Sequence, residues 1–104
     1  MKPNPKPKLE SSFQAGLIKK LEGLFHGCLI MKNDSSYRTG IPDLLVMFGE
    51  QWALLEVKRS ANETPRPNQP WYVEYGRTNS FGAFIYPENE QEVLTALASY
   101  FRVL

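Results

Sequence analysis

The chain has 104 residues, a formal net charge of +1 and a single cysteine. This length fits one domain with a modest core, and the near-neutral charge excludes a strong overall attraction to nucleic acid, so any basic binding surface must be local. The lone Cys28 excludes an internal disulfide and fits a reducing cytoplasm. The sequence has no secretory leader, membrane span or glycine-rich phosphate loop, so we expect neither a membrane partner nor a nucleotide cofactor.

The first eight residues hold three prolines and three lysines. Prolines at this density are unsuited to a helix interior, so residues 1–8 are predicted to form a flexible, extended arm. Residues 9–104 are then expected to form a single domain.

An amphipathic helix is predicted over residues 9–25. Its apolar residues recur at three- and four-residue spacing and fall within about 120° of one another; they are Leu9, Phe13, Leu17, Leu21 and Leu24. Glu10 falls inside this stripe, whereas Glu22 falls on the opposite, solvated side. A buried carboxylate needs a partner or a metal ion, so Glu10 either joins a site or supports the helix dipole while reaching water.

Two strands are predicted on either side of the dipeptide Gly49-Glu50. The runs 44–48 and 52–55 are apolar throughout, which suits strands covered on both faces. Glycine at the first of two loop residues is typical of a type II′ hairpin turn. The two strands are therefore expected to pair as a hairpin.

The register of this hairpin gathers two carboxylates and an amine. Counting back from the turn places Asp43 opposite Glu56, with Lys58 two residues further along the same face. Carboxylates 4 Å apart repel by about 1 kcal/mol in water and about 4 kcal/mol at an effective dielectric of 20. Either Lys58 offsets this repulsion in an ordinary surface hairpin, or a hard metal ion such as Mg²⁺ or Mn²⁺ does so. The charges interrupt an apolar hairpin at one end and on one face, which favours a site.

The remaining elements are predicted from apolar runs, turn residues and prolines. They are a strand near Cys28–Lys32, a polar loop over residues 33–39, a helix beginning about Pro67, a strand over Gly82–Tyr86 and a last helix from Pro87 to Phe101. Pro70 must lie in the first turn of its helix, or that helix must begin later than Pro67.

Three short motifs accompany these elements. They are Gly40-Ile41-Pro42-Asp43-Leu44, Glu56-Val57-Lys58-Arg59 and Arg66-Pro67-Asn68-Gln69. Together with the upstream Glu10 they resemble the PD-(D/E)xK nuclease superfamily, and most closely its small virus-type replication-repair (VRR-NUC) nucleases and the related Holliday-junction resolvases. The resemblance covers about residues 9–86. It implies an α/β, restriction-endonuclease-like α-β-β-β-α-β core with a C-terminal helix, an order that the predicted elements fit.

The resemblance also implies a metal-dependent nuclease site. The catalytic residues that it implies are Glu10, Asp43, Glu56, Lys58 and Gln69. The groups that would hold Mg²⁺ or Mn²⁺ are the carboxylates of Glu10, Asp43 and Glu56 and the backbone carbonyl of Val57. Lys58 would orient or activate the attacking water, or stabilise charge growing on the phosphate.

DNA is the expected partner, and its contacts must be local because the net charge is small. Candidate contacts are Lys32, Tyr37, Arg38, Arg59, Arg66 and Arg77. The N-terminal arm either touches the DNA backbone or serves only as a solubilising tail. A homodimer is expected, since cutting both strands of a junction needs two sites. The apolar side chains over residues 71–75 and 93–104 either form its interface or complete the core.

The leading hypothesis is a DNA endonuclease that hydrolyses phosphodiester bonds in the cytoplasm of a bacterial or phage-infected cell. We expect it to select branched or Holliday-junction DNA during replication, recombination or repair. One alternative is a nonspecific or nicking nuclease of the same fold, and another is a non-catalytic nucleic-acid-binding module. Repelling carboxylates argue against the last, because a binding module has no need of them.

Overall fold

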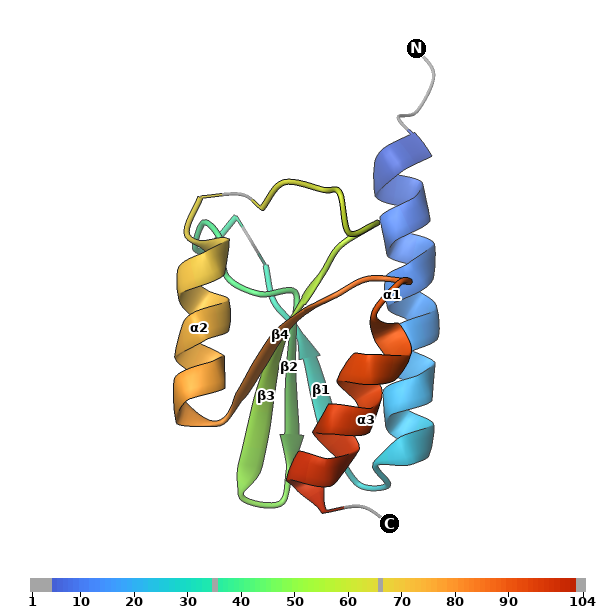
Figure 1. Cartoon of the computed structure of the whole chain (residues 1–104), viewed down its shortest axis with the longest axis vertical. Coiled ribbons are helices and arrows are strands. Elements are labelled where there is room, and N and C mark those ends of the chain that lie inside the picture. The colour runs from blue at the N-terminus through green and yellow to red at the C-terminus, as the bar shows by residue number, and fades with distance from the viewer. Residues whose placement is uncertain (1–4, 35, 66, 103–104) are drawn as a thin grey trace.

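The computed structural model describes residues 5–34, 36–65 and 67–102, which form three helices and a four-stranded sheet (Figure 1). In chain order the elements are α1 (Pro5–Leu24), β1 (Leu29–Lys32), β2 (Leu44–Phe48), β3 (Gln51–Val57), α2 (Gln69–Asn79), β4 (Phe81–Ile85) and α3 (Glu90–Phe101). The predicted order α-β-β-β-α-β with a C-terminal helix is confirmed. No helix in these described ranges combines the length and the apolar character needed to cross a membrane.

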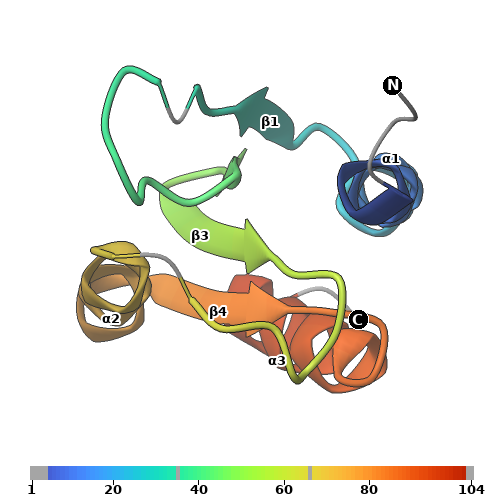
Figure 2. The same cartoon turned by 90° about the horizontal axis from the view of Figure 1, so that it is seen from above.

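The strands lie side by side in the order β1-β2-β3-β4. The first three are antiparallel neighbours, whereas β4 pairs parallel with β3. Parallel neighbours need a long crossover connection, and α2 supplies it on one face of the sheet. The helices α1 and α3 lie on the opposite side of the molecule from α2 (Figure 1, Figure 2).

One face of the sheet forms the hydrophobic core with α1 and α3. Side chains alternate between the two faces along a strand, so every second strand residue points into this core. Its buried members are Leu17, Leu21, Phe25, Leu44, Val46, Ala53, Leu55, Val57, Ile85, Val93, Leu94, Leu97 and Phe101. The apolar residues of the last helix therefore complete the core, whereas Trp71 and Tyr75 remain exposed.

Helix α1 begins four residues before the predicted start at Leu9, so residues 5–8 are helical and not part of an extended arm. Pro5 and Pro7 are tolerated because the first backbone N–H groups of a helix have no intrahelical partner. Residues 1–4, where the rest of the predicted arm falls, lie outside the described residues. At the other end of α1, Leu24 is exposed and Phe25 occupies the core, which corrects the predicted stripe.

The two C-terminal helices also begin later than predicted. Helix α2 starts at Gln69, after Asn68 in a left-handed conformation with φ 71°. The helix therefore begins later than Pro67, and Pro70 lies in its first turn, where proline is tolerated. Helix α3 starts at Glu90 and not at Pro87.

The turn between β2 and β3 sets the register of the hairpin. Gly49 has φ 62°, a conformation that glycine adopts at little cost and that a type II′ turn requires at its first loop residue. Phe48 pairs with Gln51 and Met47 with Trp52, so the predicted register is confirmed.

Helix α2 approaches β4 closely because two glycines face each other. A Cβ atom added to Gly82 would lie 2.2 Å from the Val73 carbonyl oxygen and 2.6 Å from the Arg77 backbone nitrogen. A Cβ atom on Gly76 would lie 2.9 Å from the Phe81 carbonyl oxygen. The obstructing atoms are backbone atoms, so α2 could not yield without moving as a whole.

We therefore expect Gly82→Ala to destabilise the protein by about 1–3 kcal/mol, the usual cost of overpacking. Urea unfolding followed by circular dichroism would measure the loss. The matched control is Gly16→Ala, because Gly16 is exposed in α1 with no atom within 4 Å of an added Cβ. That control should gain roughly 0.5–1 kcal/mol. Equal stability of Gly82→Ala and the unmodified protein would contradict the close approach.

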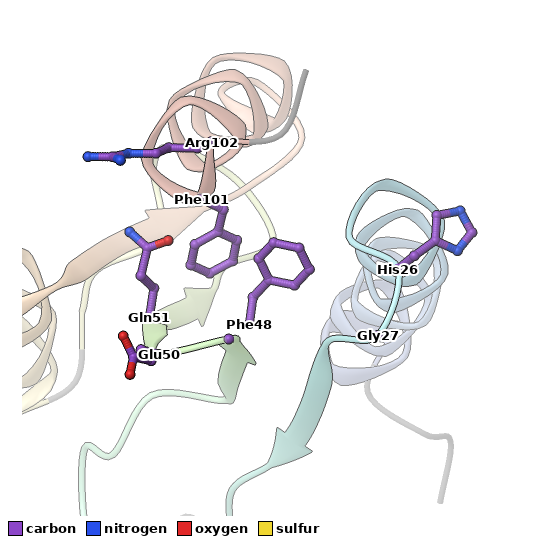
Figure 3. A pocket seen from close by; sticks show the side chains of 8 residues that line it. His26, Gly27, Phe48, Glu50, Gln51, Phe101 and Arg102 are labelled. Carbon is purple, nitrogen blue, oxygen red and sulfur yellow. The ribbon is translucent and has the colours of Figure 1, made fainter.

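A pocket of about 480 Å³ opens at the turn end of the hairpin. Its lining residues are His26, Gly27, Phe48, Gly49, Glu50, Gln51, Phe101 and Arg102. In Figure 3 the rings of Phe48 and Phe101 face each other at its base, while His26 points away from them. Asp43 and Glu56 lie at the opposite end of the same hairpin, so this pocket is separate from the predicted site.

Candidate active site

Asp43 and Glu56 lie side by side where β2 begins and β3 ends. The hairpin register pairs Leu44 with Leu55, and Asp43 and Glu56 are the next residues along. The backbone N–H of Asp43 donates to Glu56 Oε1 at 3.1 Å. The backbone N–H of Val57 donates to Asp43 Oδ2 at 2.9 Å. Each carboxylate is thus held by the strand opposite, and the predicted proximity of the pair is confirmed.

Lys58 and Gln69 complete a buried cluster with Glu56. Gln69 Nε2 donates to Glu56 Oε2 at 2.5 Å, and Lys58 Nζ donates to Gln69 Oε1 at 2.6 Å. Lys58 Nζ lies 3.6 Å from Glu56 Oε2. Gln69 therefore bridges the cation and the carboxylate and fixes the orientation of both. Its position in the first turn of α2 brings a residue eleven positions away in sequence onto Lys58.

Among the residues of this cluster, Glu56 has the most strongly shifted pKa. Burial and the nearby negative charge of Asp43 raise the pKa of Glu56 to about 8, against the opposing effect of Lys58. Glu56 therefore tends to keep its proton at neutral pH when no metal ion is bound beside it.

Glu63 is a further acidic residue at this site, and the sequence pattern did not predict it. It lies in the loop between β3 and α2. Its Oε1 is 3.9 Å from Lys58 Nζ, and its Oε2 accepts a hydrogen bond from Arg59 Nε at 3.4 Å. The sequence signal was weak, because a carboxylate in a loop rich in Pro, Asn and Thr has no periodicity that fixes its direction.

Glu10 faces the same cluster from α1, on the side that the helix pattern predicted. Burial raises the pKa of Glu10, as do the negative charges of Glu63 and Asp43 and a hydrogen bond to Glu63. Burial also raises the pKa of Glu63, but the Arg59 backbone, Lys58 and the hydrogen bond from Glu10 together lower it. The two pKa values are thus shifted in opposite directions, with that of Glu10 raised and that of Glu63 lowered.

A search of solved structures finds a chain described as "VRR_NUC domain", at a TM-score of 0.65 and 28% sequence identity. The alignment covers 88% of this chain and 97% of that one. The fold is that of a VRR-NUC nuclease domain. No protein-family model matches the sequence, and no curated protein matches it. The likeness to a VRR-NUC domain indicates a nuclease, whose substrate is a nucleic acid.

The predicted nucleic-acid contacts fall into two groups. Lys32 pairs with Leu44 and so lies at the same end of the sheet as Asp43. At that end too, Arg59 follows Lys58 in the chain and pairs with Glu63.

Tyr37 and Arg38 belong to this first group, since both are exposed in the loop that leads from β1 to Asp43. Arg77 forms the second group, in the last turn of α2 and thus at the far end of the helix that begins with Gln69. It is ion-paired with Glu74 at 2.6 Å, so it is poorly placed to contact a substrate near the site. Arg66 lies outside the described residues.

Asp43 and Glu56 are the residues best placed to hold a metal ion. Within residues 5–34, 36–65 and 67–102, no three His, Cys, Asp or Glu side chains converge as a ready metal site. Two adjacent oxygen donors that repel each other nevertheless fit a hard divalent cation, which keeps several water ligands of its own. Glu10 is hydrogen-bonded to Glu63. Its role as a ligand, like that of the Val57 carbonyl, therefore remains a prediction.

We expect Asp43→Asn to stabilise the metal-free protein. Asparagine keeps an oxygen for the Val57 N–H, while its amide can donate to Glu56 and the repulsion disappears. Because the folded-state pKa of Glu56 is about 8, above the ordinary 4.5, the contribution of Glu56 to stability in chelator is full below about pH 4.5 and is lost as pH rises through about 8. The variant should lose less stability over this window.

Thermal unfolding in a chelating buffer between pH 5 and pH 9 would measure this difference. The expected gain at pH 8 is at least about 4 °C, since 1 kcal/mol shifts the melting temperature of a domain of this size by roughly 4–8 °C. Identical melting curves for both proteins at pH 8 would show that the carboxylate pair is not strained.

Proposed function

We propose that this VRR-NUC domain is a divalent-metal-dependent endonuclease that hydrolyses phosphodiester bonds in DNA. The observation that carries the proposal is the set of contacts around Glu56. An acid beside Asp43, a cation within 3.6 Å and a glutamine that bridges them are buried together at one end of the sheet. Such a cluster is costly for stability, which argues for a functional role.

Each residue of the cluster has a role that its contacts support. Asp43 and Glu56 would hold Mg²⁺ or Mn²⁺, which would lower the pKa of a bound water and offset charge on the phosphate. Lys58 supplies a fixed positive charge where negative charge develops in the transition state. Gln69 holds the Lys58 amine in place through its carbonyl oxygen. Glu63 adds a second acidic partner for this amine, with its Oε1 3.9 Å from Lys58 Nζ.

We further propose that the substrate is branched DNA, including four-way junctions, met during replication, recombination or repair. Exposed basic residues at the site end of the sheet, Lys32 and Arg38, support contacts with more than one DNA segment. A nonspecific or nicking nuclease is the competing function of the same site. A non-catalytic binding module is disfavoured, because Asp43 beside Glu56 repels the phosphate that such a module must hold.

A cleavage panel tests both levels of this proposal. The substrates are single strand, duplex, flap, fork, splayed arm and four-way junction, each with Mg²⁺, with Mn²⁺ and with chelator. We expect metal-dependent cutting that favours branched DNA, and a loss of at least about 100-fold in rate for Asp43→Ala. Equal cutting of every substrate would overturn the selectivity, whereas no cutting with either metal would overturn the nuclease itself.

A homodimer is the proposed assembly, because a junction that is cut on both strands needs two sites. The sheet face that carries Leu29 and Met31 supports this proposal, since these side chains are 54% and 47% exposed. Their partners in the register are Met47 and Leu45. Together they make an apolar surface on strands that α2 does not cover, and apolar patches of this kind are typical of protein interfaces.

Light scattering should therefore give a mass near twice 11.9 kDa at micromolar concentration. Met31→Lys should weaken dimerisation at least about tenfold, because it places a charge in an apolar contact. Leu24→Lys is the matched control, since Leu24 is also an exposed apolar residue but lies at the end of α1. A monomeric unmodified protein would rule the dimer out.

A further inference from the structure

Aromatic side chains gather at the start of α2, the helix whose first residue, Gln69, contacts the candidate active site. The Trp71 ring stacks on Tyr75, with centroids 5.6 Å apart and planes 22° apart, and meets Tyr72 edge-on at 5.0 Å. Tyr75 in turn stacks on Trp52 at 6.3 Å. The rings of Trp52, Tyr75 and Trp71 thus form a column that ends at Trp71.

The loop between β1 and β2 brings a cation to the same place. The Arg38 guanidinium donates a hydrogen bond to the Tyr72 hydroxyl and lies over the Tyr37 ring, 6.0 Å from its centroid. The loop is held at Gly40 against the residues just before α2, since an added Cβ would lie 2.6 Å from the Pro67 carbonyl oxygen. The loop and the start of α2 lie side by side (Figure 1, Figure 2).

These rings serve no purpose in the hydrophobic core. Trp71 is 62% exposed and Tyr37 is 80% exposed, whereas the core lies on the other face of the sheet. Exposed aromatic rings next to a positive charge are the combination that single-stranded nucleic acid binds, because bases stack on rings and phosphates pair with cations.

The position of the rings relative to the site adds a geometric constraint. Gln69, which contacts both Lys58 and Glu56, and Trp71 lie in the same turn of α2, with Gln69 buried towards the site and Trp71 exposed on another side of the helix. A DNA strand that is bound at Lys58 and continues past the start of α2 would meet the exposed ring of Trp71. Its bases must either remain paired or find another surface there.

We propose that Trp71 stacks against an unpaired base of the DNA substrate, while Arg38 contacts the adjoining phosphate. The proposal rests on the nuclease function and defines its substrate more closely. In continuous duplex each base face is covered by its neighbours, so only a base released from pairing can extend the Trp52–Tyr75–Trp71 column. The site therefore favours flaps, forks and single-strand junctions over arms that are paired throughout.

Fluorescence tests the stacking without any cleavage. The chain has two tryptophans, so Trp52→Phe leaves Trp71 as the only indole, and Asp43→Asn keeps the substrate intact. A thymidine oligonucleotide should quench Trp71 emission, and the same oligonucleotide annealed to its complement should quench it far less. Trp71→Leu should weaken binding of the single strand by about tenfold, whereas Trp71→Phe should restore most of it.

Cleavage tests the consequence for substrate choice. The two substrates share one sequence and differ in whether the nucleotides beside the branch are paired or unpaired. Trp71→Leu should lower the ratio of kcat/KM for the unpaired over the paired substrate by about tenfold, and Leu24→Ala, an exposed apolar control in α1, should leave it unchanged.

Three outcomes would overturn the inference: equal quenching by duplex, unchanged single-strand binding by Trp71→Leu, or a loss of dimer mass in Trp71→Leu with DNA binding intact. The last would assign the rings to a second copy of the chain. Quenching without any cleavage would instead remove the nuclease function and leave the stacking site in place, so the two failures are distinguishable.

Discussion

The register of the β2–β3 hairpin is the constraint on which the rest of the site depends. A shift of one residue would turn Asp43 and Glu56 to opposite faces, because side chains alternate along a strand. The Gly49 turn prevents such a shift, and the core agrees with it, since the same register buries Leu44 and Leu55. The Gly49 turn at one end of the hairpin therefore determines that Asp43 and Glu56 lie together at the other end.

The acidic cluster shows how a small domain tolerates concentrated charge. Glu56 and Lys58 are buried together, and the glutamine between them satisfies both. Glu10 and Glu63 are hydrogen-bonded to each other, and the pKa of Glu10 is raised while that of Glu63 is lowered. The acidic residues of the cluster are thus distributed over α1, the hairpin and the loop before α2, and Lys58 lies among them. This arrangement leaves Glu56, whose pKa is raised most clearly, as the group with most to gain from a cation.

The two faces of the sheet serve different purposes. The face toward α1 and α3 is filled with aliphatic and phenylalanine side chains and supplies the stability of the fold. The face toward α2 is covered only in part, since α2 packs on β4 and β3. Two exposed surfaces remain on this side of the molecule. One is the apolar surface on β1 and β2, and the other is the aromatic surface at the first turn of α2. The proposed partner copy and the proposed nucleic-acid strand would therefore bind to different residues.

The sequence by itself determined the hairpin pair and the order of the elements, because a two-residue glycine turn fixes the register of the strands on either side of it. It also placed Glu10 on the correct side of its helix, since the phase of a helix is local too. Glu63, the bridging contacts of Gln69 and the cluster of Arg38, Tyr72 and Trp71 were decided by the tertiary structure. These residues lie in loops or at a helix start, where the direction of a side chain depends on packing between segments far apart in the chain. No periodic pattern in the sequence predicts that direction.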